Sequence, residues 1–258
     1  MIESEGVVTW YSDNKSKSEM MPALERMVKT CSKEERIAIA VYGIPNKDCD
    51  AKLSDAGRNK NMDDYKTFIQ ELKDVIKDRN VLYVLEPDAI GLMPKGGCGS
   101  SNGYLEYLQY AATALSENAN AQIYLDVGYW IVGANGKVKG IVLNTSNYRQ
   151  TKEMSEVCAA FKKDLGKDLK CVVDTSRNGN GAPGDEWCNA KNTAIGQPPS
   201  KPSGFDNVAY NLYVKPPGES DGECTNRNET AGQFFKEHFT QLWNNGYFVK
   251  EKGAKKLE

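Results

Sequence analysis

Apolar positions along the chain follow two periods that alternate from the N-terminus onwards. Short apolar runs rich in β-branched residues predict strands, and apolar residues spaced by three and four positions predict helices. The expected strands are Val7–Tyr11, Arg36–Tyr42, Val81–Leu85, Gln122–Val127, Gly140–Leu143, Lys170–Asp174 and Val208–Val214. The expected helices are Ser16–Cys31, Asp63–Lys77, Tyr104–Leu115, Gln150–Leu165 and Phe234–Trp243. This alternation indicates an α/β fold with a parallel sheet and right-handed crossovers.

The number of strands and the polar residues that follow them favour a barrel over an open sheet. We therefore expect a distorted seven-stranded parallel (β/α) barrel, similar to a TIM barrel. The chain has 258 residues and shows no internal repeat and no domain-sized linker. A single domain spanning residues 1–258 is the expected organisation.

One stretch combines a buried strand with acidic residues. The run Val81–Leu85 is apolar throughout, as in strands that are buried on both faces, and it ends abruptly at Glu86-Pro87-Asp88. Burying a carboxylate costs free energy unless it is paired or used. The carboxyl ends of parallel strands are also where ligands and chemistry lie in such folds. Asp88 is therefore a candidate catalytic acid, and a helix cap is its alternative role.

Composition and charge exclude several functional classes. The net charge is -2, and no basic stripe with interleaved aromatic residues occurs, which argues against a nucleic-acid partner. No apolar run reaches membrane-spanning length, so we expect no membrane partner. The glycine-rich segment near Gly179 lies in a loop, so it is weak evidence for a nucleotide site. The single histidine, His238, disfavours histidine-dependent triads and multi-histidine metal sites, and acid–base chemistry would fall to carboxylates. We expect no cofactor and no metal.

Four aspartates lie at or just beyond the C-terminal ends of predicted strands: Asp48, Asp88, Asp126 and Asp221. In a barrel these ends converge on one mouth, so several carboxylates would share a cleft. Crowded carboxylates raise the pKa of one another, which keeps one of them protonated as a general acid near neutral pH. Four aromatic residues end or follow the same strands, where flat side chains could stack on sugar rings: Trp10, Tyr42, Trp130 and Trp187. Packing in the core is the alternative role of each tryptophan.

A series of motifs in this sequence resembles the signature blocks of glycoside hydrolase family 6. They are VYGIPNKDC from Val41, VLEPDAIG around Leu85, IYLDVG from Ile123, NTSNYR from Asn144, VVDTSRNGNG from Val172, EWC from Glu186 and VKPPGESDGEC from Val214. This family comprises inverting endoglucanases and cellobiohydrolases that act on β-1,4-glucan. The resemblance thus implies a glycoside hydrolase whose partners are cellulose, β-1,4-glucan and cello-oligosaccharides, and we expect a monomer.

The resemblance also implies a catalytic role for each of five residues. Asp88 matches the general acid, which protonates the glycosidic oxygen. Asp48 matches the aspartate that raises the pKa of this acid and relays a proton from the attacking water, and Ser54 matches the serine that holds the water. Tyr42 matches the tyrosine that crowds the sugar at the cleavage point. Asp221 matches the proposed base, whose direct role is disputed in the family.

The implied substrate contacts come from several loops. Trp10 and Trp187 match stacking platforms, Lys215 and Glu219 match residues that bond glucan hydroxyls, and Arg177 and Lys215 match the cationic partners of Asp221. The full set of expected substrate-binding residues is Trp10, Asp126, Trp130, Asn144, Arg177, Trp187, Lys215 and Glu219.

Two disulfides follow from the resemblance as well, Cys49–Cys98 and Cys188–Cys224. Each would pin a loop over the cleft, and together they imply a secreted, extracellular protein. Cys31, Cys158 and Cys171 have no counterpart in the family, and we expect them to be buried and free.

The chain departs from the family pattern after the fourth strand, where Tyr129 takes the place of a histidine and only about a dozen residues lead to Gly140. Lys47 stands where arginine is common. The intervals closed by the two disulfides are short for the family, which favours an open cleft and an endoglucanase. The alternatives are a cellobiohydrolase and, because of the region around Tyr129, a glucan-binding protein without turnover.

Overall fold

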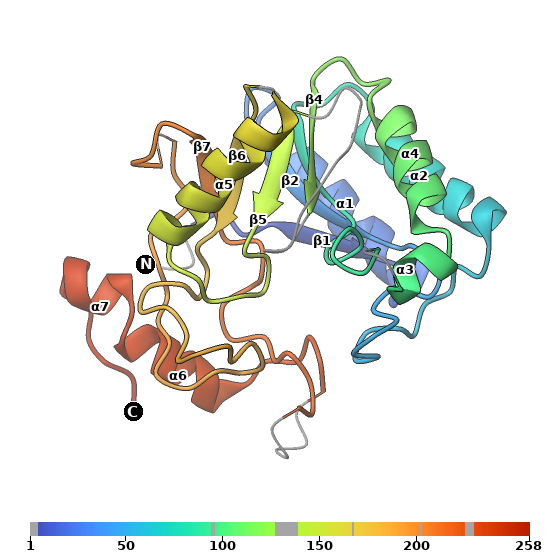
Figure 1. Cartoon of the computed structure of the whole chain (residues 1–258). Coiled ribbons are helices and arrows are strands. Elements are labelled where there is room, and N and C mark those ends of the chain that lie inside the picture. The colour runs from blue at the N-terminus through green and yellow to red at the C-terminus, as the bar shows by residue number, and fades with distance from the viewer. Residues whose placement is uncertain (1–4, 94–95, 127–138, 167, 202, 225–229) are drawn as a thin grey trace. The chain divides into compact units, whose positions relative to one another are not determined.

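A computed structural model of the protein describes residues 5–93, 96–126, 139–166, 168–201, 203–224 and 230–258 (Figure 1). The chain divides into two compact units. Residues 9–141 form one unit, and residues 1–8 together with residues 142–258 form the other. We call them the N-terminal and C-terminal units and describe each by itself. The expectation of a single domain stays a prediction.

The strands and helices predicted from the sequence are all present. The strands are β1 (Thr9–Ser12), β2 (Ile37–Tyr42), β3 (Val81–Leu85), β4 (Ala121–Asp126), β5 (Gly140–Leu143), β6 (Lys170–Asp174) and β7 (Val208–Leu212). The helices are α1 (Lys17–Thr30), α2 (Met62–Ile76), α3 (Cys98–Ser101), α4 (Tyr104–Leu115), α5 (Thr151–Leu165), α6 (Lys236–Asn244) and α7 (Tyr247–Lys252). The sequence did not predict α3 and α7, because they are too short for an apolar period to be visible.

The sheet contains seven strands in the order of the chain, which confirms the α/β class with parallel strands. In the N-terminal unit β1, β2, β3 and β4 pair in parallel. In the C-terminal unit β6 pairs in parallel with β7, and Val7 forms a parallel bridge to Tyr213.

The core of the N-terminal unit lies between the sheet and its helices. Alternate residues of β2, β3 and β4 point toward α1, α2 and α4 and are buried against them. All five residues of β3 are buried, as expected for a strand covered on both faces. Asn61 caps the N-terminus of α2, and its side chain accepts hydrogen bonds from the backbone N–H groups of Asp63 and Asp64. Such a cap satisfies donors that the first turn leaves unpaired.

The strand register brings the predicted acidic residues to one edge of this unit. Val41 pairs with Leu85, and Leu85 pairs with Leu125. The residues that follow, Tyr42 and Asp126 among them, therefore lie at the same carboxyl edge of the sheet. This is the edge at which parallel α/β folds place their ligands.

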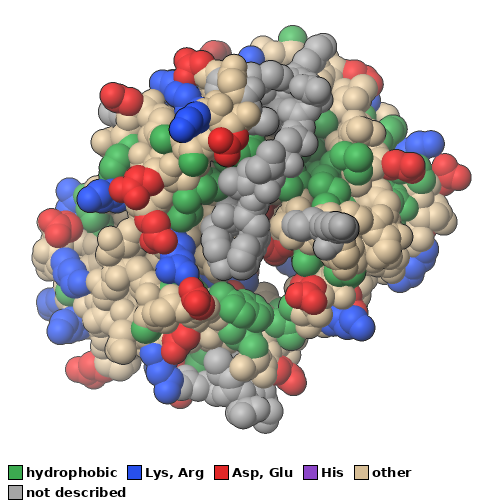
Figure 2. All heavy atoms as spheres, viewed as in Figure 1, with side chains coloured by type: hydrophobic (Ala, Val, Ile, Leu, Met, Phe, Trp, Pro, Cys, Tyr) green, Lys and Arg blue, Asp and Glu red, His purple; other side chains and the backbone are tan. Residues whose placement is uncertain are grey.

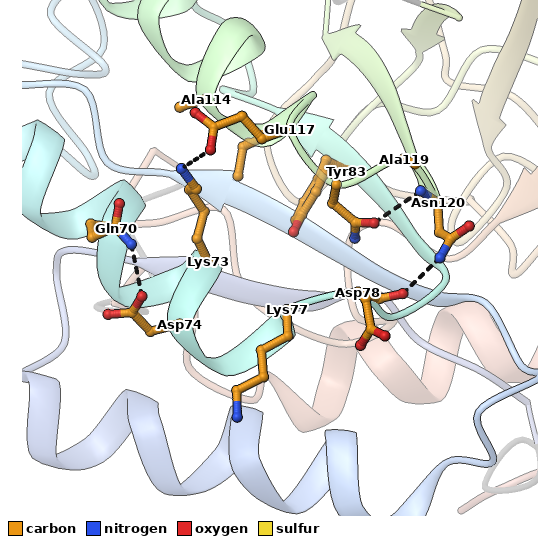
Figure 3. A pocket seen from close by; sticks show the side chains of 12 residues that line it. Gln70, Lys73, Asp74, Lys77, Asp78, Tyr83, Ala114, Glu117, Ala119 and Asn120 are labelled. Atoms are coloured by element: carbon orange, nitrogen blue, oxygen red, sulfur yellow. Dashed lines mark hydrogen bonds and ion pairs between the residues drawn. The ribbon is translucent and has the colours of Figure 1, made fainter.

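A hollow of about 790 Å³ lies at the opposite end of the same strands (Figure 3). Its walls come from the C-terminal turns of α2 and α4 and from the segments that lead into β3 and β4. Lys73 lies 2.8 Å from Glu117, and Gln70 Nε2 donates to Asp74 Oδ1 at 2.7 Å. Lys73 and Glu117 form an ion pair, Asp74 accepts a hydrogen bond from a neutral amide, and none of the predicted site residues that the structure describes line the hollow.

In the C-terminal unit α5 is attached to β6 by a disulfide between Cys158 and Cys171, with Cα atoms 6.1 Å apart. The expectation that these two cysteines are free is wrong. The two cysteines are only 13 positions apart, because a short connection follows α5 and leads directly into β6. Cys158 on the helix and Cys171 on the strand are both buried where the two elements pack together. Cys31 is free, as expected, but it is half-buried and not buried.

The surface carries charge of both signs. Figure 2 shows Lys and Arg side chains interspersed with Asp and Glu over the face that it draws, in keeping with the net charge of -2. None of the helices in the described ranges is both long and apolar enough to cross a membrane.

Candidate active-site residues

The predicted site residues fall into two groups, one in each unit. The Asp88 group, in the N-terminal unit, comprises Trp10, Tyr42, Asp48, Ser54, Asp88 and Asp126. The Asp221 group, in the C-terminal unit, comprises Asn144, Arg177, Trp187, Lys215, Glu219 and Asp221. Trp130 and Tyr129 lie outside the described residues.

Asp88 follows β3 on a sharp turn. Glu86 and Asp88 both have positive φ, +49° and +65°, a conformation that residues other than glycine seldom adopt and that is typical of functional sites. The backbone N–H of Asp88 donates to Asp126 Oδ1 at 3.1 Å, and Asp126 is fully buried. Asp88 itself is exposed. The fold thus fixes the backbone of Asp88 and leaves its side chain where a substrate could reach it.

Glu86, in the turn that carries Asp88, is hydrogen-bonded to the residues that follow β2. Its carboxylate accepts hydrogen bonds from the backbone N–H groups of Gly43, at 3.0 Å, and Ile44, at 3.2 Å, and from the Tyr65 hydroxyl at 2.8 Å. Burial raises the pKa of Glu86 to about 7. Glu86 was not among the predicted site residues, although its place two positions before Asp88 could have indicated a supporting role.

Tyr42 lies among several carboxylates. Burial raises the pKa of its hydroxyl well above 10, and negative charges nearby add to the effect. These charges belong to Asp88, Asp48 and Glu86. The Trp10 ring meets the Tyr42 ring edge-on, with centroids 5.5 Å apart. The edge-to-face contact links the expected sugar platform to the residue expected to crowd the sugar.

Asp48 lies in the loop between β2 and α2. Its Oδ2 atom accepts hydrogen bonds from the backbone N–H groups of Leu53, at 2.8 Å, and Ser54, at 2.6 Å. Partial burial raises the pKa of Asp48, the nearby charge of Asp55 adds to it, and the two N–H donors oppose it. Because Asp48 and Ser54 are joined in this way, the structure brings together two residues that the sequence placed six positions apart.

Asp221 is the centre of the second group. Its Oδ2 atom accepts from Arg177 Nη1 at 2.8 Å, from the Asn189 backbone N–H at 2.8 Å and from the Tyr148 hydroxyl at 3.2 Å. Burial alone would raise the pKa of Asp221, but the charges of Arg177 and Lys215 outweigh it and hold the pKa below its usual value. Asp221 is therefore ionised and strongly bound within its own unit.

The cations beside Asp221 are themselves buried. The Arg177 guanidinium lies over the Tyr148 ring, 4.3 Å from its centroid, and donates to the Ser146 carbonyl. Lys215 Nζ lies 3.7 Å from Asp221 and 3.9 Å from Glu219. Burial lowers the pKa of Lys215. The predicted pairing of both cations with Asp221 is present in the structure.

Asp174, which ends β6, organises the loops of this group. Its carboxylate accepts four backbone N–H bonds of 2.9 to 3.2 Å, from Ser146, Ser176, Val214 and Lys215. One buried side chain thus holds the loops that follow β5, β6 and β7. Sequence reasoning placed Asp174 at a strand end but gave it no role.

Asn144 was expected to bind substrate, which stays a prediction, and its side chain makes hydrogen bonds to the protein backbone. The residue is fully buried, and its amide donates to the carbonyls of Asp174 at 2.8 Å and Arg149 at 3.0 Å. Its Oδ1 atom accepts the Arg149 backbone N–H at 2.9 Å. The side chain therefore supports a loop. Asp126, also expected to bind substrate, is fully buried and supports the Asp88 turn.

Trp187 is 48% exposed, as a stacking platform must be. Its neighbour Cys188 forms the expected disulfide with Cys224, and the other expected disulfide, Cys49–Cys98, is present in the N-terminal unit. Across the described ranges, no three His, Cys, Asp or Glu side chains gather in a way that could hold a metal ion.

Comparison with known proteins relates the chain to proteins named endoglucanases. Endoglucanase A from Cellulomonas fimi is 34% identical over 220 residues, which are 80% of this chain and 46% of that protein. Endoglucanase A from Thermobispora bispora is 31% identical over 232 residues, which are 83% of this chain and 50% of that protein. The chain spans about half the length of these relatives.

The fold agrees with a solved structure of the endoglucanase Cel6 from Mycobacterium tuberculosis in complex with methyl-cellobiosyl-4-deoxy-4-thio-β-D-cellobioside. The TM-score is 0.83 at 25% identity, and the match covers 95% of this chain and 88% of that one. The family model "Glycosyl hydrolases family 6" matches residues 1–131 and 129–246. These matches extend over most of the sequence, and so this chain belongs to glycosyl hydrolase family 6.

Proposed function

We propose that the chain is an inverting endo-β-1,4-glucanase that hydrolyses internal bonds of cellulose or a related β-glucan. One observation carries the proposal. Asp48 is a half-buried carboxylate whose pKa is raised, and it accepts a hydrogen bond from the backbone N–H of Ser54. The negative charges of Asp48 and Asp88 both raise the pKa of the Tyr42 hydroxyl. An exposed acid beside a second carboxylate and an aromatic platform is what general-acid cleavage of a glycoside needs.

In the proposed reaction Asp88 protonates the glycosidic oxygen while water attacks the anomeric carbon from the opposite face of the sugar. Ser54 holds this water and Asp48 accepts its proton. The tight binding of Asp221 by Arg177, Tyr148 and Asn189 supports this assignment, because a carboxylate with a lowered pKa is a weak general base. Asp221 instead fixes the cations around it.

The proposed substrate contacts are those that the family resemblance implies, and their residues range from the exposed Trp187 to the buried Lys215. Trp10 and Trp187 stack on sugar rings, and Lys215 and Glu219 bond glucan hydroxyls. Asp126 and Asn144 are fully buried and bind the protein backbone, so in this proposal they serve the substrate through the loops that they support.

We favour endo action over release of cellobiose from chain ends. The disulfides Cys49–Cys98 and Cys188–Cys224 close short intervals of 49 and 36 positions, which leave little chain to roof a tunnel. The relatives named endoglucanases support the same choice. Three disulfides also support an extracellular location, because such bonds persist in oxidising compartments.

The decisive experiment is proton NMR of cellohexaose during digestion by the wild type and by Asp88→Ala. Early α-anomer, with an almost silent variant, is the expected result. Early β-anomer would mean retention and would overturn the mechanism. Binding of the oligosaccharide without any product would favour a glucan-binding protein. Rapid loss of viscosity of a soluble substituted cellulose is expected for endo action, and a slow loss would favour a cellobiohydrolase.

A further inference from the structure

The loop between β2 and α2, residues 43–61, is held at both ends by one buried residue, Asp13, which directly follows β1. Near the start of the loop, Lys47 Nζ lies 2.5 Å from Asp13 Oδ1. Near its end, the backbone N–H of Asn59 donates to Asp13 Oδ2 at 2.9 Å. A single carboxylate therefore ties the two ends of the loop together.

The contact is close and almost free of solvent. The side chains of Asp13 and Lys47 are 1% and 3% exposed. A Cβ atom at Gly57 would lie 2.2 Å from an Asp13 carboxylate oxygen, so no larger residue fits there without displacement. The backbone N–H of Arg58 donates to the Asp13 carbonyl at 3.2 Å. Charges buried this deeply interact strongly, and removing one leaves the other uncompensated.

The residues proposed to manage the attacking water lie between these two anchor points. Asp48 follows Lys47 directly, and Ser54 is bonded to Asp48 and, through its carbonyl, to Asn14 Nδ2 at 3.4 Å. The chain on either side of Ser54, at residues 51–52 and 55–56, is exposed. The position of the Asp48–Ser54 pair therefore depends on the fixed ends of the loop together with the Cys49–Cys98 disulfide, which holds the residue that follows Asp48.

The same ion pair touches Tyr42. Lys47 Nζ lies 5.3 Å from the centroid of the Tyr42 ring, and the backbone N–H of Asp13 donates to the Tyr42 carbonyl at 3.3 Å. Asp13 thus contacts the strand end and the loop that carry three residues of the Asp88 group.

We propose that Asp13 is a positioning residue that holds the Asp48–Ser54 segment and Tyr42 in their reactive arrangement through its ion pair with Lys47. This inference rests on the proposed function, because it assigns Asp13 a purpose within that reaction. Nothing in the motifs of the chain singled out Asp13.

The first test is Asp13→Asn, which keeps an acceptor for Asn59 and removes the charge that Lys47 needs. Since a displacement of about 1 Å can lower a rate roughly 100-fold, we expect kcat on cellohexaose to fall about 10- to 100-fold. KM should change by less than about twofold, because Trp10 and Trp187 are untouched.

Limited trypsinolysis provides a readout that a general loss of stability does not reproduce. Lys52 lies within the loop and Lys33 lies outside it, and both are exposed. In Asp13→Asn we expect cleavage after Lys52 to accelerate about tenfold while cleavage after Lys33 stays at the wild-type rate. Fragments are reduced before analysis, because Cys49–Cys98 joins them.

The double variant Asp13→Asn/Lys47→Met removes both buried charges and guards against a single variant that fails to fold. We expect it to regain thermal stability while kcat stays low and cleavage after Lys52 stays fast. Recovery of both kcat and stability would overturn the proposal, as would wild-type kcat and wild-type cleavage in Asp13→Asn. Glu117→Gln is the control, because it breaks a more exposed ion pair of the same unit at the hollow in Figure 3.

The activity of the wild type distinguishes the proposed function from the proposed role of Asp13. A wild type that leaves cellohexaose intact would refute the function, and the ratio of cleavage after Lys52 to cleavage after Lys33 would still report on the loop. An active wild type beside an equally active Asp13→Asn would refute the positioning role alone.

Discussion

Asp221 and Arg177 form an ion pair in which Oδ2 lies 2.8 Å from Nη1, with the arginine side chain fully buried and the aspartate 6% exposed. The carboxylate also binds Asn189 and Tyr148, so its charge is committed to neighbours within the unit. A group held in this way is well suited to fix its surroundings and poorly suited to take up a proton.

Asp221→Asn tests this role. The change leaves Arg177 buried without its counter-charge, and breaking such a pair costs about 3–5 kcal/mol of unfolding free energy. We expect that loss in urea denaturation, together with a fall in kcat of roughly 100-fold. Added azide, which replaces a missing base, should not restore activity. Restoration by azide would identify Asp221 as the base.

Asp88→Asn tests the general acid through the leaving group. Cellohexaose needs protonation of the departing oxygen, so its hydrolysis should fall by roughly 100- to 10,000-fold. A dinitrophenyl β-cellobioside needs no proton on its leaving group, and its hydrolysis should fall less than about tenfold. Equal losses on the two substrates would contradict the assignment of Asp88 as the acid.

Glu86 makes stability depend on pH. Burial raises its pKa from 4.5 to about 7 in the folded state, so the folded protein holds this proton more tightly than the unfolded chain. The contribution of this proton to the unfolding free energy is therefore complete below about pH 4.5, and it is lost as the pH rises to about 7. The difference corresponds to about 3 kcal/mol.

Denaturation of the wild type and Glu86→Gln between pH 4 and 8 measures this linkage. Glutamine has nearly the same shape and does not titrate, so the unfolding free energy of the variant should lack the fall between about pH 4.5 and 7 that the wild type shows. Parallel curves for the two proteins would show that Glu86 keeps its ordinary pKa.

The disulfide between Cys158 and Cys171 closes a short loop. By the chain-entropy relation, removing it with Cys158→Ala/Cys171→Ala should lower the unfolding free energy by about 3 kcal/mol. Cys31→Ser is the control, since Cys31 is free and half-buried, and should cost less than about 1 kcal/mol. Urea titration of both variants makes the comparison. Equal costs would mean that the disulfide does not stabilise the fold.

The sequence predicted what depends on local pattern. The apolar run of β3 and the acidic turn after it identified the buried strand and Asp88, because periodicity and strand-end chemistry are both visible in the order of residues. Glu86, Asp13 and Asp174 were missed because their roles arise from hydrogen bonds and, for Asp13, an ion pair with groups that are distant in the sequence. No residue pattern encodes those contacts before the strands are aligned.

The cysteines and two buried polar residues show the same limit of prediction from the sequence. Cys158 and Cys171 are ordinary members of a helix and a strand until α5 packs on β6. Asn144 and Asp126 carry polar groups at strand ends, as ligand-binding residues do, but three-dimensional packing turns them toward the main chain. Burial, which the sequence does not display, separates residues that face substrate from those that hold loops.

Asp174 gives the clearest case of such a loop-holding residue. Asp174→Asn replaces one of its oxygens by an amide N–H₂ group, which would face two of the four backbone donors that the carboxylate now accepts. Leaving buried donors unpaired costs about 1–3 kcal/mol each, so we expect an unfolding free energy lower by about 2–5 kcal/mol. Because Lys215 is one of these donors, KM for cello-oligosaccharides should rise as its loop loosens. Asp185→Asn, which removes an exposed partner of Arg149 in the same unit, serves as the control and should leave both quantities nearly unchanged. Wild-type stability in Asp174→Asn would show that the loops of the Asp221 group are held by other contacts.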